Sequence, residues 1–147
     1  MKETSAPLAG EMSGHIFFAD KYFGFDDALY AAVRLIGVLA RLRRSLSELR
    51  DAMPQTVATP ELRFAVDRQR KAAAVCEVQE MLAADGCCFS DVDGVRVDTT
   101  DGWWLLRASN TEDMLVVRAE AKDEGGLARL MAEVDARLAA VGIVREN

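Results

Sequence analysis

WWLLRASNTEDMLVVRAE, residues 103–120, holds two apolar runs on either side of a short polar segment. The runs, residues 103–107 and 114–120, are rich in the aromatic, β-branched and aliphatic residues that favour strands. A connection this short joins antiparallel neighbours. Because Trp103 and Trp104 are adjacent, their side chains are expected on opposite faces of the resulting sheet.

Further strands are predicted upstream of this pair. Residues 95–98 alternate between apolar and polar side chains, as a half-buried strand does. The dipeptide Asp93-Gly94 before them predicts a two-residue hairpin turn, with residues 89–92 as the other strand. Residues 61–66 form another short extended stretch.

Two amphipathic helices accompany these strands. Asp67 is expected to cap the first, which ends at Gly86, and Asp123 is expected to cap the second. We therefore expect an α+β domain in residues 55–147, with an antiparallel sheet of about four strands and two helices on one face.

The N-terminal third, residues 1–54, predicts an incomplete α/β segment. Asp26 is expected to cap a helix over about residues 27–42 that is apolar nearly all round, and Ser45-Leu46-Ser47-Glu48 predicts the start of a short second helix. On the long helix, we expect one side to be buried and the other to stay toward water: the first holds Leu29, Val33, Ile36 and Leu39, and the second holds Ala28, Ala32 and Leu35. Residues 55–60, which are polar and end in proline, predict a linker between two domains.

Composition excludes several classes of protein. The net charge of −6 argues against nucleic acid or an anionic membrane as a partner, since phosphate groups are held by clustered positive charge. No apolar run reaches the ~20 residues that span a bilayer, so we expect a cytoplasmic protein. Three cysteines and one histidine in this arrangement indicate neither a disulfide framework nor a zinc site.

The polar segment between the two apolar runs is a candidate phosphate site. Arg107 offers a planar fork that can bind two phosphate oxygens, and Ser109, Asn110 and Thr111 add short hydrogen-bonding side chains. Arg118, on the next predicted strand, either adds charge or only supports the site. A plain polar hairpin loop is the alternative interpretation.

A glycine-bounded loop, residues 10–15, is a candidate sugar site. Glu11 and Ser13 suit sugar hydroxyls, and His15 can move a proton near neutral pH. The alternative is a tight turn with a surface histidine.

The two loops together, with YFGFDDA at residues 22–28 and DGVR at 93–96, closely resemble the phosphomannomutase/phosphoglucomutase family over essentially the whole chain. Enzymes of this family have four domains around a cleft. They interconvert hexose 1-phosphates and hexose 6-phosphates through a phosphoserine and a bisphosphorylated intermediate.

The resemblance implies a role for each loop. Residues 1–54 would end the third domain, with Glu11 and Ser13 on the sugar hydroxyls and His15 as a catalytic residue beside the transferring group. Residues 55–147 would be the fourth domain. There, the phosphate that does not react would be held by Arg107, Ser109, Asn110 and Thr111.

The sequence departs from the family pattern in three places. Asp113 stands where the family usually has proline, and its carboxylate is expected to oppose an anion unless the backbone turns it away. Neither the phosphoserine loop nor the Asp-Gly-Asp-x-Asp-Arg loop that holds Mg²⁺ occurs in the chain. We therefore expect the chain to bind no cofactor, although Mg²⁺ is expected in the complete enzyme.

We therefore hypothesise that this chain is the substrate-binding portion of a phosphohexomutase and is inactive alone. Whether the chain itself is an enzyme stays open. Its expected partners are a phosphorylated hexose and either the missing N-terminal part of the enzyme or a second copy that contacts its N-terminal third. The alternative is a non-enzymatic module that binds phosphosugars or regulates another protein.

Overall fold

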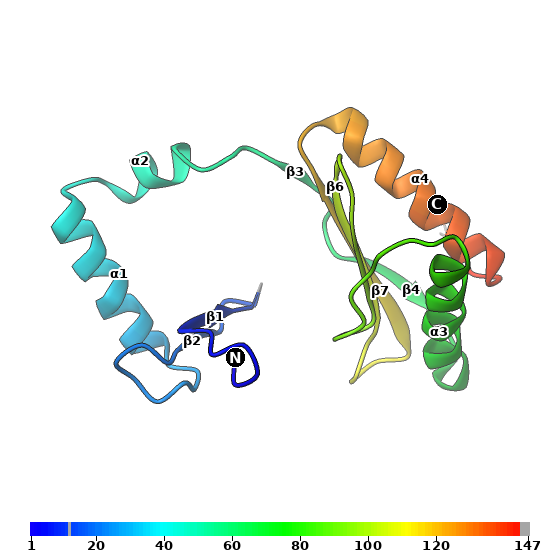
Figure 1. Cartoon of the computed structure of the whole chain (residues 1–147), viewed down its shortest axis with the longest axis horizontal. Helices are drawn as coiled ribbons and strands as arrows, with labels where there is room; N and C mark the ends of the chain where they lie inside the picture. Colours follow the sequence, from blue (N-terminus) through cyan, green and yellow to red (C-terminus); the bar gives the residue numbers. More distant parts are fainter. Residues whose placement is uncertain (12, 145–147) are drawn as a thin grey trace. The chain divides into compact units, whose positions relative to one another are not determined.

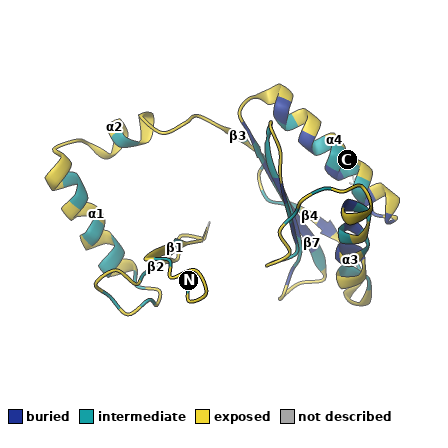
Figure 2. Cartoon of the chain, viewed as in Figure 1, coloured by how far each residue is buried: buried dark blue, intermediate teal, exposed yellow. Residues whose placement is uncertain are grey.

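The computed structural model describes residues 1–11 and 13–144, which form two compact units. The N-terminal unit covers residues 1–54, and the C-terminal unit begins at Gln55 (Figure 1). Among the described residues, no helix is long and apolar enough to cross a membrane. The buried apolar residues of the described chain all belong to the C-terminal unit (Figure 2).

The C-terminal unit is built on an antiparallel sheet of five strands: β3 (Val57–Ala58), β4 (Leu62–Ala65), β5 (Val95–Asp98), β6 (Gly102–Ala108) and β7 (Met114–Ala121). Their order is β3-β7-β6-β5, and β4 also pairs with β7. The longest pairing joins β6 to β7 and runs from Gly102 opposite Ala121 to Ala108 opposite Leu115. The two apolar runs of the sequence are therefore antiparallel neighbours, as predicted, and they form the centre of the sheet.

β3 and β4 lie one after the other along the same edge of β7. Val57 pairs with Ala121 and Leu62 pairs with Val117, while the Thr59 amide donates to the Ala119 carbonyl at 2.9 Å. Pro60 has no N–H to donate, which suits it to the break between the two short strands. The prediction of a linker over residues 55–60 was wrong in part, because β3 joins this segment to the sheet.

Two helices, α3 (Arg68–Ala84) and α4 (Glu124–Ala140), cover one face of this sheet (Figure 1). Their buried residues meet the alternate residues of the strands that point to the same side, among them Trp104, Leu106, Leu115 and Val117. Trp104 is fully buried there, and Trp103 lies on the other face, where the Arg96 guanidinium stacks on its ring. The predicted α+β fold, with both helices on one face, is confirmed.

Two local predictions in this unit were wrong. Residues 89–92 form no strand, and only Ser90 bridges to Arg96, which closes a longer turn than the two-residue hairpin that was expected. Asp67 precedes α3, but its side chain makes no capping hydrogen bond. Asp123, in contrast, caps α4 by accepting from the Gly126 amide at 2.7 Å.

The N-terminal unit consists of a small hairpin and two helices: β1 (Leu8–Gly10), β2 (Ile16–Phe18), α1 (Ala28–Leu42) and α2 (Leu46–Asp51). The predicted capping box starts α2, because Ser45 and Glu48 satisfy each other's backbone amides. The cap of α1 is Asp27, whose carboxylate accepts from the Tyr30 amide at 2.9 Å. The prediction that Asp26 caps this helix was wrong by one residue, and Asp26 has another role.

No described residue of the N-terminal unit is buried (Figure 2). The prediction for α1 was wrong, because the side that was expected to be buried carries Leu29, Val33 and Ile36, which are 81%, 67% and 64% exposed. The hairpin instead faces a different side of the helix, which includes Ala31 and Val38. The described residues of this unit therefore form regular elements with an apolar surface but no buried core.

We predict that Gly94→Ala destabilises the protein more than Gly86→Ala. Both glycines have positive φ, +82° and +71°. A Cβ on Gly94 would lie 2.2 Å from the Leu106 carbonyl oxygen, whereas a Cβ on Gly86 would meet nothing within 4 Å. Gly86→Ala should cost about 1 kcal/mol of unfolding free energy through backbone strain alone, and Gly94→Ala should cost about 3 kcal/mol, because β6 must shift as well.

Chemical denaturation of the two variants, followed by circular dichroism, measures this difference. Equal losses of unfolding free energy would show that the turn does not press on β6.

Candidate functional site

Arg107 begins the candidate phosphate site as part of β6 rather than of the loop that follows it. It pairs with Val116 and alternates with the buried Leu106, so its side chain belongs to the sheet face that α3 and α4 leave uncovered. Its backbone abuts Gly94, since a Cβ on that glycine would lie 2.8 Å from the Arg107 Cα. No hydrogen bond or ion pair joins the Arg107 guanidinium to another described residue. This half-buried cation is thus free to bind an anion.

Ser109 holds the loop between β6 and β7 in shape. It is buried, and its Oγ accepts from the amides of Thr111 at 3.4 Å and Glu112 at 3.1 Å. Because both acceptor positions of the hydroxyl are used, its hydrogen is left to donate. The exposed side chains of Asn110 and Thr111 make no hydrogen bond to described residues.

Lys71, in the first turn of α3, fixes the same loop from the helix side. Its Nζ donates at 2.8 Å to the carbonyl oxygens of both Ser109 and Glu112, and its side chain is only 15% exposed. Sequence reasoning missed Lys71, because one lysine in the basic first turn of a helix has no pattern that connects it to a loop 38 residues away.

The extra carboxylate of this loop also faces Lys71. Asp113 Oδ1 lies 3.6 Å from Lys71 Nζ. The nearby cation offsets the negative charge that was expected to oppose an anion, although the pair is partly solvated and weakly coupled. The Asp113 carbonyl accepts from the Val66 amide at 3.2 Å, which fixes the backbone at this position.

Arg118 is the second cation of the uncovered face without a carboxylate partner among the described residues. It lies on β7 opposite Leu105, diagonal to Arg107, and its only side-chain hydrogen bond of the described structure goes to the Thr59 carbonyl at 3.4 Å. By contrast, Arg63 is bound to Glu61, and Arg96 is bound to Asp98. Unpaired positive charge on this face is therefore concentrated at Arg107 and Arg118.

The candidate sugar loop joins β1 to β2 in the N-terminal unit. It is closed by two backbone hydrogen bonds, from the Glu11 amide to the His15 carbonyl at 2.9 Å and from the Gly14 amide to the Glu11 carbonyl at 3.0 Å. Ser13 Oγ donates to Glu11 Oε2 at 3.0 Å. Glu11, Ser13 and His15 are all exposed, so their polar atoms can reach a ligand.

Asp26, which sequence reasoning assigned to a helix cap, contacts His15 instead. His15 Nδ1 lies 2.5 Å from Asp26 Oδ2, and the Ile16 amide donates to Asp26 Oδ1 at 3.3 Å. The hydrogen bond and the charge of Asp26 raise the pKa of His15 above its usual value, with a smaller contribution from Glu11. The sequence does not indicate the contact between His15 and Asp26, because it forms only where the chain folds back after β2 and Phe17 bridges to Asp26.

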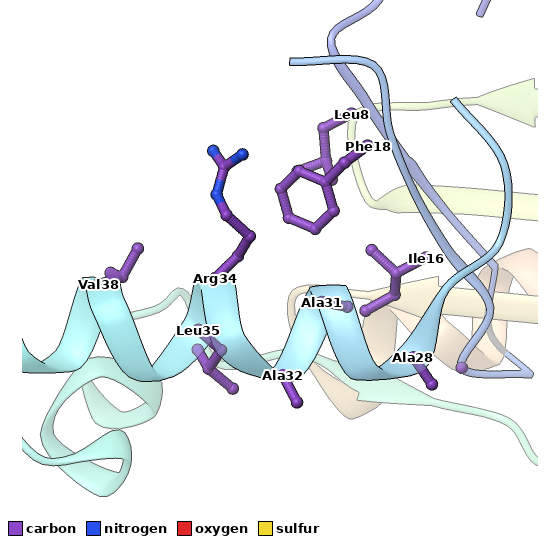
Figure 3. A pocket seen from close by; sticks show the side chains of 10 residues that line it. Leu8, Ile16, Phe18, Ala28, Ala31, Ala32, Arg34, Leu35 and Val38 are labelled. Atoms are coloured by element: carbon purple, nitrogen blue, oxygen red, sulfur yellow. The ribbon is translucent and has the colours of Figure 1, made fainter. Parts of the chain in front are cut away.

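An apolar groove of about 500 Å³ separates this hairpin from α1. Figure 3 shows Leu8, Ile16 and Phe18 of the hairpin on one side and Ala31, Leu35 and Val38 of α1 on the other. Glu11, Ser13 and His15 do not line it. The groove suits apolar side chains, and the candidate sugar residues lie outside it.

No group of three or more His, Cys, Asp or Glu side chains that could bind a metal ion occurs in the described part of the chain. The described residues therefore supply no ligand set for the Mg²⁺ that the family resemblance implies for the complete enzyme.

Comparison with known proteins matches both units to domains of one protein family. The family model for the C-terminal domain of phosphoglucomutase/phosphomannomutase matches residues 61–137, and the model for alpha/beta/alpha domain III of the same family matches residues 1–57. A phosphomannomutase/phosphoglucomutase of Pseudomonas aeruginosa strain PAO1 is 43% identical over 141 residues, and a phosphoglucomutase of Neisseria gonorrhoeae is 42% identical over 132 residues. These matches cover 96% and 88% of this chain.

The crystal structure of a phosphoglucomutase/phosphomannomutase family protein from Burkholderia thailandensis is also similar. It matches 96% of this chain with a TM-score of 0.81 and 39% identity. The chain spans 30% of that structure and of the Pseudomonas aeruginosa relative, and 28% of the Neisseria gonorrhoeae relative.

We predict that Lys71→Met loosens the loop of residues 109–113 while β6 and β7 stay paired. Methionine keeps the apolar stem of lysine but cannot donate to the Ser109 and Glu112 carbonyls. Each lost hydrogen bond from a charged donor costs about 1.5–3 kcal/mol at most, and water replaces part of it because the bond to the Glu112 carbonyl is exposed. Hydrogen exchange of the Thr111 and Glu112 amides should therefore be faster in the variant.

Lys122→Met is the matched control, since Lys122 likewise donates to a loop carbonyl, that of Thr100 at 2.8 Å, in a different loop. Unchanged exchange of the Thr111 and Glu112 amides in Lys71→Met would show that Lys71 does not hold the loop.

Proposed function

The chain belongs to the phosphoglucomutase/phosphomannomutase family, and we propose that it forms the part of a phosphohexomutase that binds the sugar and the non-reacting phosphate of a hexose phosphate. The observation that carries this proposal is the Arg107 guanidinium, which has no partner among the described residues and stands beside a loop that Ser109 and Lys71 hold in shape. A free cation beside a fixed set of donors suits a dianion.

The phosphate is bound mainly by Arg107. Its fork donates two parallel hydrogen bonds to two phosphate oxygens, while the hydroxyl of Ser109 and the side chains of Asn110 and Thr111 donate to the remaining oxygens. Arg118 adds charge from the neighbouring strand. The pairing of Asp113 with Lys71 supports this proposal, because it offsets one carboxylate of the loop, and Arg63 offsets the other, that of Glu112.

The sugar is bound by the loop of the N-terminal unit. Glu11 accepts hydrogen bonds from sugar hydroxyls, and Ser13 exchanges its present bond to Glu11 for one to the sugar. His15 lies beside the transferring group and moves a proton. The backbone hydrogen bonds that close this loop support the proposal, since they hold three polar side chains on one exposed turn.

Phosphoryl transfer belongs to a longer enzyme than this chain. The phosphoserine loop does not occur in the sequence, and binding in the manner proposed requires no metal from the described residues. In that enzyme, the apolar groove between α1 and the hairpin packs against the rest of the domain to which the N-terminal unit belongs. The lack of any buried residue in the described part of this unit supports such packing, because apolar surface on this scale is usually covered.

We predict that Arg107→Ala weakens the binding of glucose 6-phosphate by about ten- to a hundredfold, the effect of losing a charge-assisted hydrogen bond. Arg107→Lys should restore only part of the affinity, because an ammonium group keeps the charge but not the fork. Titration of the ligand into each protein, followed by backbone NMR, gives both the affinity and the residues that shift.

Arg96→Ala is the matched control, since it removes an arginine from the same sheet face that is already bound to Asp98. Its affinity should stay close to that of the unaltered chain. Equal affinity in Arg107→Ala, or shifts that avoid residues 109–111, would contradict the proposed phosphate site.

We also predict that the chain alone gives no mutase turnover on glucose 1-phosphate or mannose 1-phosphate, with or without Mg²⁺, because it supplies no phosphoserine. A coupled assay on purified protein tests this, with a full-length relative as the positive control. Turnover that copurifies with the chain and disappears when one of its own serines is replaced would show that the chain is a complete enzyme.

A further inference from the structure

His15 and Asp26 form a pair whose geometry goes beyond the role proposed for His15 alone. Asp26 is fixed on one side by the Ile16 amide, which donates to Oδ1, and by the backbone bridge between Phe17 and Asp26. Its other oxygen, Oδ2, lies 2.5 Å from His15 Nδ1. The carboxylate is thus held by β2, the strand that begins next to His15.

The contact determines which ring nitrogen carries the proton of the neutral imidazole. An ionised carboxylate can only accept hydrogen bonds, so Nδ1 must keep its hydrogen. In the neutral ring, the lone pair is then on Nε2. The His15 side chain is 54% exposed, and Nε2 makes no hydrogen bond to another described residue, so this nitrogen is open to a ligand.

We infer that Asp26 is a positioning residue that makes Nε2 the one nitrogen of His15 through which a proton enters or leaves. The imidazolium releases its Nε2 proton to an oxygen of the ligand and becomes the Nδ1–H form, and that form takes a proton back from a hydroxyl at the same nitrogen. The Nδ1–H bond to Asp26 is unchanged throughout. The use of this proton in phosphoryl transfer rests on the proposed function, whereas the pairing itself does not.

Two charged groups face the His15 ring. Asp26 is in direct contact, and Glu11 lies on the same turn and acts through its charge alone. Both favour the imidazolium, so His15 should stay protonated to a higher pH than an unpaired histidine. With Asp26 removed, only the weaker influence of Glu11 remains.

The experiment is an NMR titration of the imidazole nitrogens, which is free of overlap because His15 is the only histidine of the chain. Long-range proton–nitrogen spectra between about pH 5 and 9 give the pKa and the tautomer together. We expect a raised pKa and the Nδ1–H tautomer in the unaltered chain.

Asp26→Asn gives the sharpest outcome. The Ile16 amide can only donate and therefore binds the oxygen of the new side chain, which turns its NH₂ group toward His15. Nδ1 must then accept, so the tautomer should reverse to Nε2–H and the pKa should fall. In Asp26→Ala, the pKa should fall and the ordinary mixture of imidazole tautomers should return.

Asp20→Asn is the control, since it removes the same charge from a residue that pairs with Arg34. It should leave the tautomer and the pKa of His15 unchanged. An ordinary pKa with mixed tautomers in the unaltered chain, or the same tautomer in all four proteins, would overturn the inference. Phosphate-induced shifts at residues 109–111 are recorded on the same samples, so failure of this pairing is distinguished from failure of the proposed function.

Discussion

The pairing of β6 with β7 is the interaction on which the C-terminal unit depends. Its register places one set of alternate residues, including Trp104 and Leu106, against α3 and α4, and leaves the other set, including Arg107, on the uncovered face. A shift by one residue would exchange the two sets and bury the arginine. The same pairing ends at Ala108 opposite Leu115, which fixes where the phosphate loop begins. Core and candidate site therefore follow from one register.

The sequence was sufficient for features that repeat or that lie close together along the chain. Runs of strand-favouring apolar residues identified the central strands, and local capping signals identified α2 and α4, since Ser45 and Asp123 satisfy amides three residues away. Arg107 was recognised because its residue type and its polar neighbours already suggest anion binding. Such signals involve residues close together in the sequence, so they do not depend on contacts with distant parts of the chain.

What could not be predicted depends on contacts between distant residues. Lys71 meets the carbonyl of Glu112, 41 residues further along the chain, and Asp26 meets His15 only after the chain has turned back on β2. Asp26 and Asp27 are equally good caps by residue type, and only the folded chain separates them. The prediction of the buried side of α1 was wrong for the same reason. The sequence of a helix that is apolar nearly all round does not indicate which side the rest of the protein will cover.

The candidate site residues divide into those already satisfied by the protein and those that are not. Lys71 and Asp26 use their hydrogen bonds on the loop backbone or on another side chain, and Ser109 accepts two hydrogen bonds from the loop while its own hydrogen stays free to donate. Arg107 and Nε2 of His15 make none with the described residues, although the backbone of Arg107 is held in the β6–β7 ladder and the His15 ring is held by Asp26. Fixed groups with unused donors and acceptors lose little entropy when they bind, whereas mobile groups must first be ordered. This division favours a ligand site over two ordinary surface turns, because Arg107 stays unpaired beside its loop while Arg63 and Arg96 on the same sheet face are bound to carboxylates.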